Sequence, residues 1–411
     1  MNTRSRTILI AGGGIAGLTA ALCLSRSGFR VDVMERAEGF ETIGAGLQIS
    51  PNALSVLAML GLDRAIKNLA VAPSAIRVLS GRTGGQITAI PLGASAIERF
   101  SMPYLVVHRA DLQQILASAC KDDPDISLHL DCTFHDVAAH ANGVTALVGH
   151  RETNVEMHGM AMIGADGVHS QVRQLAMGGS AAVDTGFNAW RALIPSDVLG
   201  GSEDRENTRL WLHPRAHAVA YPVRNGRYLN LVAFIRNREG ERDSGNGLAA
   251  TERSSAEMAA SFEGWHESFL DLLRHKARWT VWPLLRAPSG GPWAQGRVAL
   301  IGDAAHAMFP FAAQGAAMGI EDAATLAGCL AAASEDQDSV SSALVAYESK
   351  RRARVRRVAN ISHVNGLIYH LPEPLAMFRD LFMKAAGGRR LLARQDWIYQ
   401  WRPDSLPLIR Q

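Results

Sequence analysis

The chain has 411 residues, of which 47% are hydrophobic and 20% are charged, so it can form one large domain or two closely joined domains around a substantial core. Its formal net charge of +3 gives no broad electrostatic argument for a nucleic-acid partner. The four cysteines lie far apart and form no CxxC pair, which argues against a zinc site and a dithiol redox centre. We therefore predict reduced cysteines, no bound metal and no nucleic-acid partner.

Hydrophobic segments are short throughout the chain. The apolar stretch near the N-terminus is broken by glycines within a few residues, so it lacks the length of a signal peptide, and no run of about 18 apolar residues follows. We therefore expect a cytoplasmic protein without a membrane span. The sequence leaves a monomer and a homodimer equally open.

The N-terminal part begins with the pattern of a βαβ unit. Residues 7–11 form a continuous apolar run typical of a buried parallel strand, residues 15–27 show helical spacing, and residues 30–35 predict a second strand. A hairpin is predicted next, from strands at residues 76–80 and 86–91. A strand at residues 104–108 then leads into a helix from residue 110, and several short strands follow at residues 126–148. This part favours an α/β fold.

The middle of the chain changes to alternating strand patterns between residues 188 and 236. Two of these strands are joined across Asn225-Gly226, a dipeptide that strongly favours a hairpin, so an antiparallel sheet is predicted here. The remaining predicted elements are a helical stretch, a strand and a long helix, at residues 255–276, 278–285 and 340–371.

Three strongly polar segments lie between or within these predicted elements. We interpret "EGERDSGNG" (239–247) and "SEDQD" (334–338) as exposed loops. The basic run "KRRARVRR" (350–357) lies inside the predicted long helix, and we interpret it as a solvated helix face to which no ligand is assigned.

A glycine motif follows the first predicted strand directly. Gly12, Gly14 and Gly17 have GxGxxG spacing at the start of a helix, and Glu35 ends the next strand. Glycines permit a tight turn and a close approach to a pyrophosphate, the helix N-terminus favours its negative charge, and an acid accepts hydrogen bonds from a ribose. The acid Glu35 argues against a dinucleotide with a 2′-phosphate on its ribose, but it does not distinguish NAD from FAD as the cofactor. The neighbouring residues counted as cofactor-binding candidates are Ile15, Ala16 and Arg36.

Taken with four further motifs, the fingerprint makes nearly the whole chain resemble the group A flavoprotein monooxygenases, the single-component aromatic hydroxylases that include salicylate and 3-hydroxybenzoate hydroxylases. The motifs are "GAGLQISPNA" (44–53), "HRADLQQIL" (108–116), "GADGVHSQVR" (164–173) and "GDAAHAMFPFAAQGAAMGIEDA" (302–323). The resemblance implies FAD, held tightly and without a covalent bond, with NAD(P)H as a visiting co-substrate.

The resemblance also implies roles for individual residues in FAD binding. Arg109 resembles the arginine that contacts the FAD phosphate and ribityl region, with Gln113 as its companion, and Asp303 resembles the aspartate that bonds the ribityl chain. Small residues after it allow a helix to direct its N-terminal amides at the flavin pyrimidine edge. The candidates at the start of that helix are Gly315, Ala316 and Ala317.

Two other family motifs contribute candidates. Asp166 resembles the aspartate of a DG motif that serves both FAD and the nicotinamide nucleotide, and Gln48 is counted as cofactor-binding. One departure from the family is visible, because Gly319 stands where alanine is usual, and we expect it to loosen that helix slightly.

For the fold, the resemblance implies an α/β architecture of the p-hydroxybenzoate hydroxylase type. A Rossmann-like FAD-binding domain (1–73, 99–180 and 291–330) is joined to an inserted mixed or antiparallel β-sheet substrate domain (74–98 and 181–290). A C-terminal helical region (331–411) completes the chain.

For the reaction, the resemblance implies that hydride passes from NAD(P)H to FAD, and that O2 then gives an electrophilic flavin C4a-hydroperoxide. We therefore predict a monooxygenase that hydroxylates a small, electron-rich aromatic or heteroaromatic ring of the hydroxybenzoate, salicylate or hydroxypyridine type. A flavin oxidase or NADH oxidase and a non-catalytic flavin-binding redox sensor are the alternatives. The ring substrate, any accompanying decarboxylation and the choice between NADH and NADPH stay open.

The substrate face is assigned to the segment "HAVAYP", in which His217 and Tyr221 lie four residues apart on a predicted strand. Strand alternation directs both side chains to one side of the sheet. A histidine that titrates near neutral pH can take a phenolic proton and so make the ring more nucleophilic. The rival interpretation is a packed strand whose histidine and tyrosine are coincidental. His306 is the second candidate base, although it could equally orient its own turn.

Overall fold

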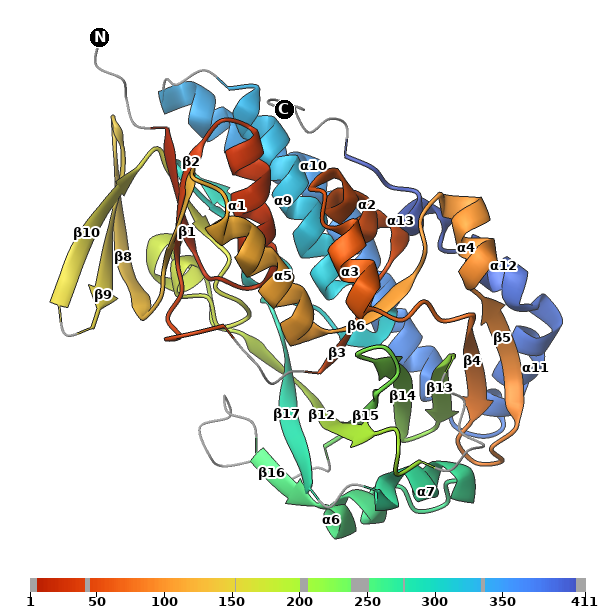
Figure 1. Ribbon diagram of the computed structural model, residues 1–411. Helices are drawn as coiled ribbons and strands as arrows, with labels where there is room; N and C mark the ends of the chain where they lie inside the picture. Colours follow the sequence, from red (N-terminus) through yellow and green to blue (C-terminus); the bar gives the residue numbers. More distant parts are fainter. Residues whose placement is uncertain are drawn as a thin grey trace.

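The computed structural model describes residues 6–40, 45–151, 153–199, 206–237, 251–275, 278–333 and 337–403. Strands and helices of the N-terminal part form the upper body in Figure 1, a large sheet lies below them, and the C-terminal helices run along the side of both. The predicted loop at 239–247 lies outside the described residues, as do the first three residues of the loop at 334–338.

A six-stranded sheet forms the centre of the upper body, in the order β18-β19-β11-β1-β2-β7. Its strands pair in parallel except for the antiparallel edge strand β18. All five residues of β1 are buried, as the continuous apolar run predicts. The bounds are β1 (Thr7–Ala11), β2 (Arg30–Met34), β7 (Ile126–His129), β11 (Ala161–Gly164), β18 (Ala294–Gln295) and β19 (Val298–Leu300).

Helices and two small sheets surround this central sheet (Figure 1). The three-stranded sheet β10-β9-β8 was not predicted as a separate unit, because short strand patterns do not reveal their partners. The small strands are β3 (Gly46–Ile49), β6 (Leu105–His108), β8 (Cys132–His140), β9 (Gly143–His150) and β10 (Thr153–Gly159). The helices are α1 (Ile15–Arg26), α2 (Pro51–Met59), α3 (Asp63–Leu69), α4 (Gly93–Phe100), α5 (Arg109–Lys121), the π-helix η1 (Val172–Ala176), α8 (Asp303–His306), the 3-10 helix η2 (Pro310–Ala312) and α9 (Gly315–Ala331).

Helices α1 and α9 pack closely at Gly319. A Cβ atom added there would lie 3.0 Å from the Cβ of Ala16 and 3.3 Å from the Cα of Gly302. Glycine at this position therefore lets the two helices and the turn before α8 approach one another. The expectation that Gly319 loosens its helix overlooked this packing, since only the fold brings Ala16 against it.

The lower sheet has eight strands in the order β16-β17-β12-β15-β14-β13-β4-β5. It is mixed, because β13 and β4 pair in parallel whereas the other neighbours are antiparallel. The predicted hairpin at Asn225-Gly226 is confirmed, and both residues have positive φ (55° and 77°) between β14 and β15. The bounds are β4 (Ala75–Ser80), β5 (Gln86–Pro91), β12 (Val183–Pro195), β13 (Thr208–His213), β14 (Ala216–Val223), β15 (Tyr228–Arg236), β16 (Thr251–Ser254) and β17 (Arg278–Arg286).

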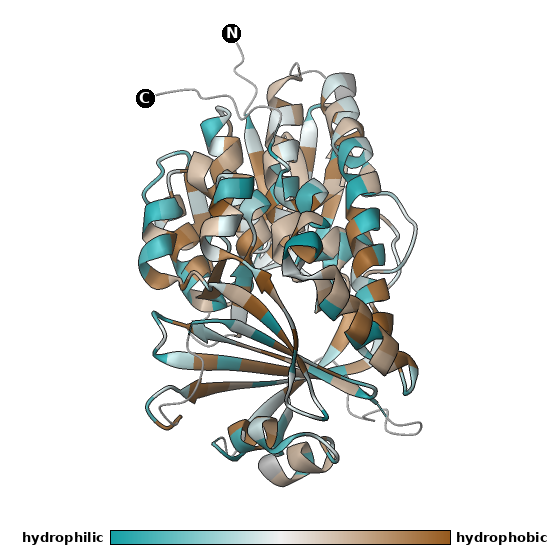
Figure 2. Ribbon diagram, turned by 90° about the vertical axis from the view of Figure 1, so that its right-hand side faces the viewer, coloured by the Kyte–Doolittle hydropathy of each residue, from teal (hydrophilic) through white to brown (hydrophobic). Residues whose placement is uncertain are grey.

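The two faces of the lower sheet are covered differently. One face packs on α6 (Ser255–Ala260) and α7 (Glu267–Arg274), which lie beneath the sheet in Figure 2, while the opposite face is turned toward the upper body. The predicted single helical stretch is two helices, since Gly264 between them has a φ of +82°. The C-terminal helices are α10 (Gln337–Tyr369), α11 (Leu375–Ala386), α12 (Gly388–Ala393) and α13 (Asp396–Tyr399).

The basic run in α10 is not the fully solvated helix face that was predicted. Arg351 is only 1% exposed, and it donates hydrogen bonds of 2.6 Å to Glu321 and 2.7 Å to Asp322 on α9. Arg354 donates to Glu321 and to the carbonyl oxygen atoms of Trp397 and Ile398. Part of the run is therefore a buried ion-pair network rather than a solvated face, because one side of α10 packs on two carboxylates of α9.

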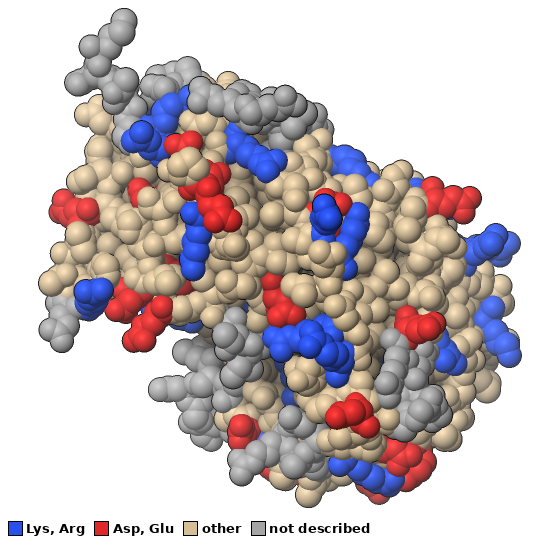
Figure 3. Space-filling view, in the orientation of Figure 1, with Lys and Arg blue, Asp and Glu red and all other residues tan. Residues whose placement is uncertain are grey.

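Charges on the exposed surface are mixed in sign. Figure 3 shows lysine and arginine side chains interspersed with aspartate and glutamate over the face in view. Of the helices in the described residues, none combines the length and the apolar character needed to cross a membrane.

Candidate active site

The glycine motif forms the connection from β1 to α1, and steric contacts explain two of its glycines. Gly12 has a φ of +107°, and a Cβ atom there would lie 2.5 Å from the carbonyl oxygen of Ala165. A Cβ atom on Gly17 would lie 2.0 Å from the carbonyl oxygen of Gly12. Gly14 differs, since a Cβ atom there meets nothing within 4 Å. The start of α1, whose first residues are Ile15 and Ala16, therefore borders open space.

Glu35 holds this glycine loop from the end of β2. Its carboxylate accepts hydrogen bonds from the backbone N–H of Gly13 at 2.7 Å and of Ala37 at 3.0 Å. A carboxylate has further acceptor capacity, so these bonds leave room for a ribose hydroxyl. Arg36 is exposed beside it. The pKa of His169 is lowered mainly by the burial of His169 and next by the positive charge of Arg36. Arg36 thus lies near the "GADGVHS" segment.

Two buried polar atoms at the loop have no hydrogen-bond partner among the described residues. Asp166 accepts the N–H groups of Gln171 and Val172 through Oδ2, but its Oδ1 has no partner. Gln113 donates to the carbonyl oxygen of Gly13 at 2.8 Å, while its Oε1 has no partner. Burial raises the pKa of Asp166. Buried polar atoms are rarely left unsatisfied, so these two acceptors fit a polar cofactor beside the loop.

Asp303 and Gly315 come together at the start of α9. Asp303 is exposed, and its Oδ1 lies 4.0 Å from the position of a Cβ atom on Gly315. Arg173 fixes this turn to the neighbouring motif, because it donates to the carbonyl oxygen of Ala304 at 2.7 Å and to that of Val168 at 2.6 Å. The first turn of α9 has no side-chain cap and contains the small residues Ala316 and Ala317. The uncapped backbone N–H groups of this turn can therefore donate hydrogen bonds to an electron-rich ring edge.

The strand β14 directs His217, Val219 and Tyr221 toward the upper body, as the alternation predicts. Ala218 and Ala220 face the opposite core over α6 and α7. The ring of Tyr221 packs against Gly46, where a Cβ atom would lie 2.4 Å from its Cε2. This face of the sheet therefore meets the strand β3.

Gln48 on β3 is engaged with two tyrosines. It accepts a hydrogen bond from the hydroxyl of Tyr104 and forms a second one with Tyr221. Its amide therefore lies between the sheet and β6 rather than free beside the glycine loop. The predicted cofactor role of Gln48 stays a prediction, and its contacts tie it to the tyrosines of the substrate face.

His217 is 1% exposed and lies in a cluster of rings. Its ring stacks on Phe234 with centroids 4.7 Å apart and contacts Phe311 and Tyr369 edge-on. Its Nδ1 lies 2.9 Å from Nε2 of His370, which follows α10. Burial, and after it His370, lowers the pKa of His217 well below the usual value. The imidazole is therefore neutral near pH 7.

His306 occupies a different environment, inside the ion-pair network of α9 and α10. Its Nε2 donates to Asp322, and its ring lies 5.0 Å from that of Trp293. Burial would raise the pKa of Asp322, but His306 and Arg351 lower it to about 2. These contacts favour the alternative that His306 orients its turn, through a bond to the carboxylate of Asp322.

Arg109 begins α5, where its backbone N–H donates to the carbonyl oxygen of Ala45 and its side chain is exposed. Three residues of the site were not predicted, namely Tyr104, Arg191 and His370. Strand alternation could have placed Arg191 on the face of β12 that Tyr221 shares, but no local pattern signals His370. Among the described residues, no group of histidine, cysteine, aspartate or glutamate side chains suits a metal ion.

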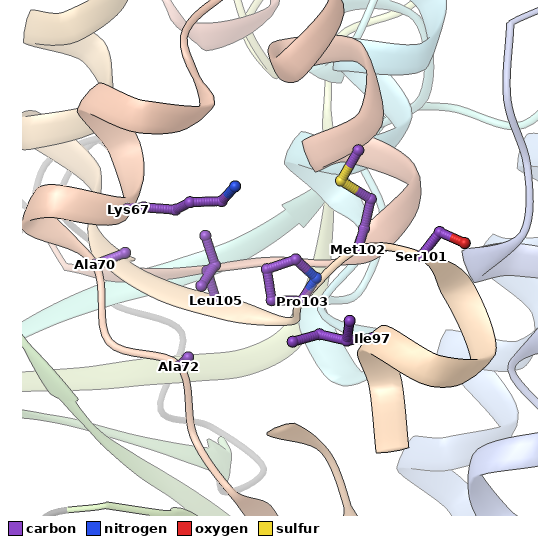
Figure 4. A pocket seen from close by; sticks show the side chains of 8 residues that line it. All are labelled: Lys67, Ala70, Ala72, Ile97, Ser101, Met102, Pro103 and Leu105. Carbon is purple, nitrogen blue, oxygen red and sulfur yellow. The ribbon is translucent and has the colours of Figure 1, made fainter. Parts of the chain in front are cut away.

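A hollow of about 530 Å³ lies elsewhere, between α3, α4 and β6. Figure 4 shows Lys67 and Met102 at its edge, together with apolar side chains including Ile97 and Leu105. It includes none of the predicted site residues.

Comparisons with known proteins identify relatives that match nearly the whole chain. The family model described as "FAD binding domain" matches residues 5–362. The 3-hydroxybenzoate 6-hydroxylase of Polaromonas naphthalenivorans is 32% identical over 400 residues, and the match covers 97% of each chain. The 3-amino-4-hydroxybenzoate 2-monooxygenase PtnB3 of Streptomyces platensis is 34% identical over 401 residues, again covering 97% of each.

Among solved structures, a salicylate hydroxylase substrate complex is 25% identical with a TM-score of 0.82, and the match covers 98% of both chains. The predicted fold class and the predicted FAD cofactor are thereby confirmed. The chain belongs to the FAD-binding domain family, among the single-component FAD-dependent aromatic monooxygenases.

Proposed function

We propose that this monooxygenase uses NAD(P)H and O2 to hydroxylate a hydroxybenzoate-type ring held against the lower sheet. The observation that carries the proposal is the placement of His217 and Tyr221 on one face of β14, where His217 contacts Phe311 in the segment that precedes α9. When bound, FAD supplies hydride acceptance and O2 activation. The chain's own residues must bind the ring, orient it and manage its phenolic proton.

The glycine loop, Asp303 and the start of α9 are the groups proposed to hold FAD. Gly14 borders open space, Asp166 and Gln113 offer unpartnered oxygen atoms, and Asp303 is exposed beside Gly315. Arg109 and Arg36 supply exposed positive charge for phosphates. Replacement of Asp303 by alanine should weaken FAD retention, and equal retention measured by fluorescence titration would remove Asp303 from the site.

The substrates named for the similar proteins support the ring chemistry. 3-Hydroxybenzoate, 3-amino-4-hydroxybenzoate and salicylate all carry a ring hydroxyl and a carboxyl group. On this sheet face, His217 provides an acceptor for the hydroxyl proton, and Arg191 provides a cation for the carboxylate. Arg191 pairs with Val232, which pairs with Val219 between His217 and Tyr221. The ring is therefore proposed to lie across the two valines.

His217 acts in this proposal as the base that accepts the phenolic proton at Nε2. Removal of that proton raises the electron density of the ring, which an electrophilic oxygen requires. The expectation that His217 titrates near neutral pH is not supported, because burial lowers its pKa well below 6.5. A neutral imidazole is therefore present near pH 7 and can accept a proton from bound substrate.

The test is a screen of hydroxybenzoates, aminohydroxybenzoates and hydroxypyridines for stimulated NADH and NADPH consumption in ¹⁸O2. One labelled oxygen atom in an aromatic product supports the proposal. Peroxide as the sole product with every compound would favour an oxidase instead. FAD binding without consumption of either nucleotide would favour a redox sensor.

A further inference from the structure

We propose that His370 is the positioning partner of His217 and the outlet for the proton that His217 receives. The observation is the distance of 2.9 Å between Nδ1 of His217, on β14, and Nε2 of His370, at the end of α10. These residues are 153 positions apart in the chain, and the contact joins the substrate face to the C-terminal helices. The inference rests on the proposed role of His217 as the base.

The surroundings of His217 leave few orientations for its ring. Phe234 stacks on one side, while Phe311 and Tyr369 contact it edge-on. Among the described residues its sole hydrogen-bond partner is His370. The identity of that partner therefore decides which nitrogen of His217 carries the proton.

The surroundings of His370 keep its imidazole neutral. Its ring stacks on Phe187 with centroids 5.6 Å apart. Burial is the largest cause that lowers its pKa to about 4, followed by the charges of Arg236, Arg379 and His213. These groups come from β15, α11 and β13, the elements packed around it. A positive charge on His370 is disfavoured here, so His370 is neutral. In the proposed arrangement its Nε2 accepts the Nδ1–H of His217.

This arrangement leaves the lone pair of His217 Nε2 for the substrate. When the phenolic O–H bond breaks, the proton forms a bond to Nε2 of His217, and the Nδ1 proton of His217 passes to Nε2 of His370. His370, which is only partly buried, then releases its own Nδ1 proton to water. Both imidazoles finish neutral, the substrate is a phenolate, and one proton has reached solvent. The same steps in reverse reset both tautomers.

The first test does not require turnover. FAD-loaded protein labelled with ¹⁵N-histidine is measured by NMR, with His217→Gln used to assign the signal. His217 should be protonated at Nδ1 in the wild type. It should remain so in His370→Gln, whose side-chain oxygen can accept the bond, and it should shift toward the Nε2-protonated form in His370→Ala. A wild-type His217 protonated at Nε2, or the same tautomer in His370→Ala, would overturn the proposal.

The second test separates positioning from proton release. With the best substrate from the screen, His370→Ala should lower hydroxylation about 10- to 100-fold, a range typical of lost orienting partners. His370→Gln should also be slow, because glutamine cannot relay a proton, and added imidazole should restore activity to His370→Ala. Asn360→Ala, on an exposed position of the same helix, is the control and should leave the rate unchanged. Wild-type rates in both His370 variants would overturn the relay.

If no compound in the screen is hydroxylated, the proposed function fails while the tautomer measurement still reports on the histidine pair.

Discussion

The glycine loop and the substrate face of the lower sheet are proposed to recognise their ligands by different means. At the loop, small residues expose backbone and space is scarce, because a Cβ atom added at Gly17 would lie only 2.0 Å from a carbonyl oxygen. At the sheet, the proposed recognition depends on the side chains of His217, Tyr221 and Arg191, which come from two strands. At Gly12 and Gly17 the folded loop is therefore intolerant of added atoms, whereas the sheet face is sensitive to altered functional groups.

The largest expected effect separates two glycines of the loop. Gly17→Ala should prevent normal folding or lower Tm strongly, because its Cβ would collide with the carbonyl oxygen of Gly12. Gly14→Ala should leave the stability of the FAD-free protein nearly unchanged, since nothing lies within 4 Å of its Cβ. It should nevertheless weaken FAD binding. Thermal unfolding and FAD titration of both variants check this, and normal FAD affinity in Gly14→Ala would place the cofactor elsewhere.

The ion-pair network behind α9 supports both regions and gives the next effect. Arg351→Met should reduce the free energy of unfolding by about 3–5 kcal/mol, because two buried carboxylates lose a partner. Arg356→Ala, an exposed change in the same basic run, should alter it by less than about 0.5 kcal/mol. Urea unfolding measures both. Equal losses in the two variants would contradict the buried network.

At the substrate face, changes of function should occur without changes of folding. His217→Gln should lower hydroxylation about 100-fold or more, as expected for a lost general base, while FAD content stays intact. Tyr221→Phe should have a smaller effect on rate and should increase the fraction of NAD(P)H consumed without product. Product per nucleotide consumed is the measurement. Wild-type yield in both variants would leave the pair as packing residues.

The same burial that keeps the histidines neutral should be visible as a pH effect on stability. For His370 the folded pKa of about 4 lies below the usual 6.5, so the unfolded chain binds the proton first as pH falls. Stability is therefore complete above about pH 6.5 and declines toward pH 4, by up to about 2 kcal/mol at pH 5. Urea unfolding at pH 7 and pH 5 should show a smaller decline in His370→Gln. An equal decline in the variant would show that other titratable groups cause the loss of stability at pH 5.

The sequence was sufficient for elements whose signal is local. The strand, glycine turn and acid of the βαβ unit lie within 30 residues, and the hairpin at Asn225-Gly226 follows from two residues with positive φ. Contacts between distant segments could not be predicted in this way. The basic run of α10 met Glu321 and Asp322 only in the fold, and the same holds for Gln48 between two tyrosines and for His370 beside His217.

The smallest expected effect tests whether the substrate face recognises charge as well as shape. Burial raises the pKa of Tyr221, and the positive charge of Arg191 is the next largest influence and lowers it. The charge of Arg191 therefore acts on this face of the sheet. Its guanidinium also lies 5.8 Å from the ring of Trp282. Arg191→Met keeps much of the apolar stem but removes the cation, so KM for a hydroxybenzoate should rise about tenfold, with a smaller change in kcat. For a phenol without a carboxylate, the variant and wild type should have similar KM values. An equal rise for both compounds would mean that Arg191 shapes the sheet rather than binding the carboxylate, because a lost ion pair affects only the charged ligand.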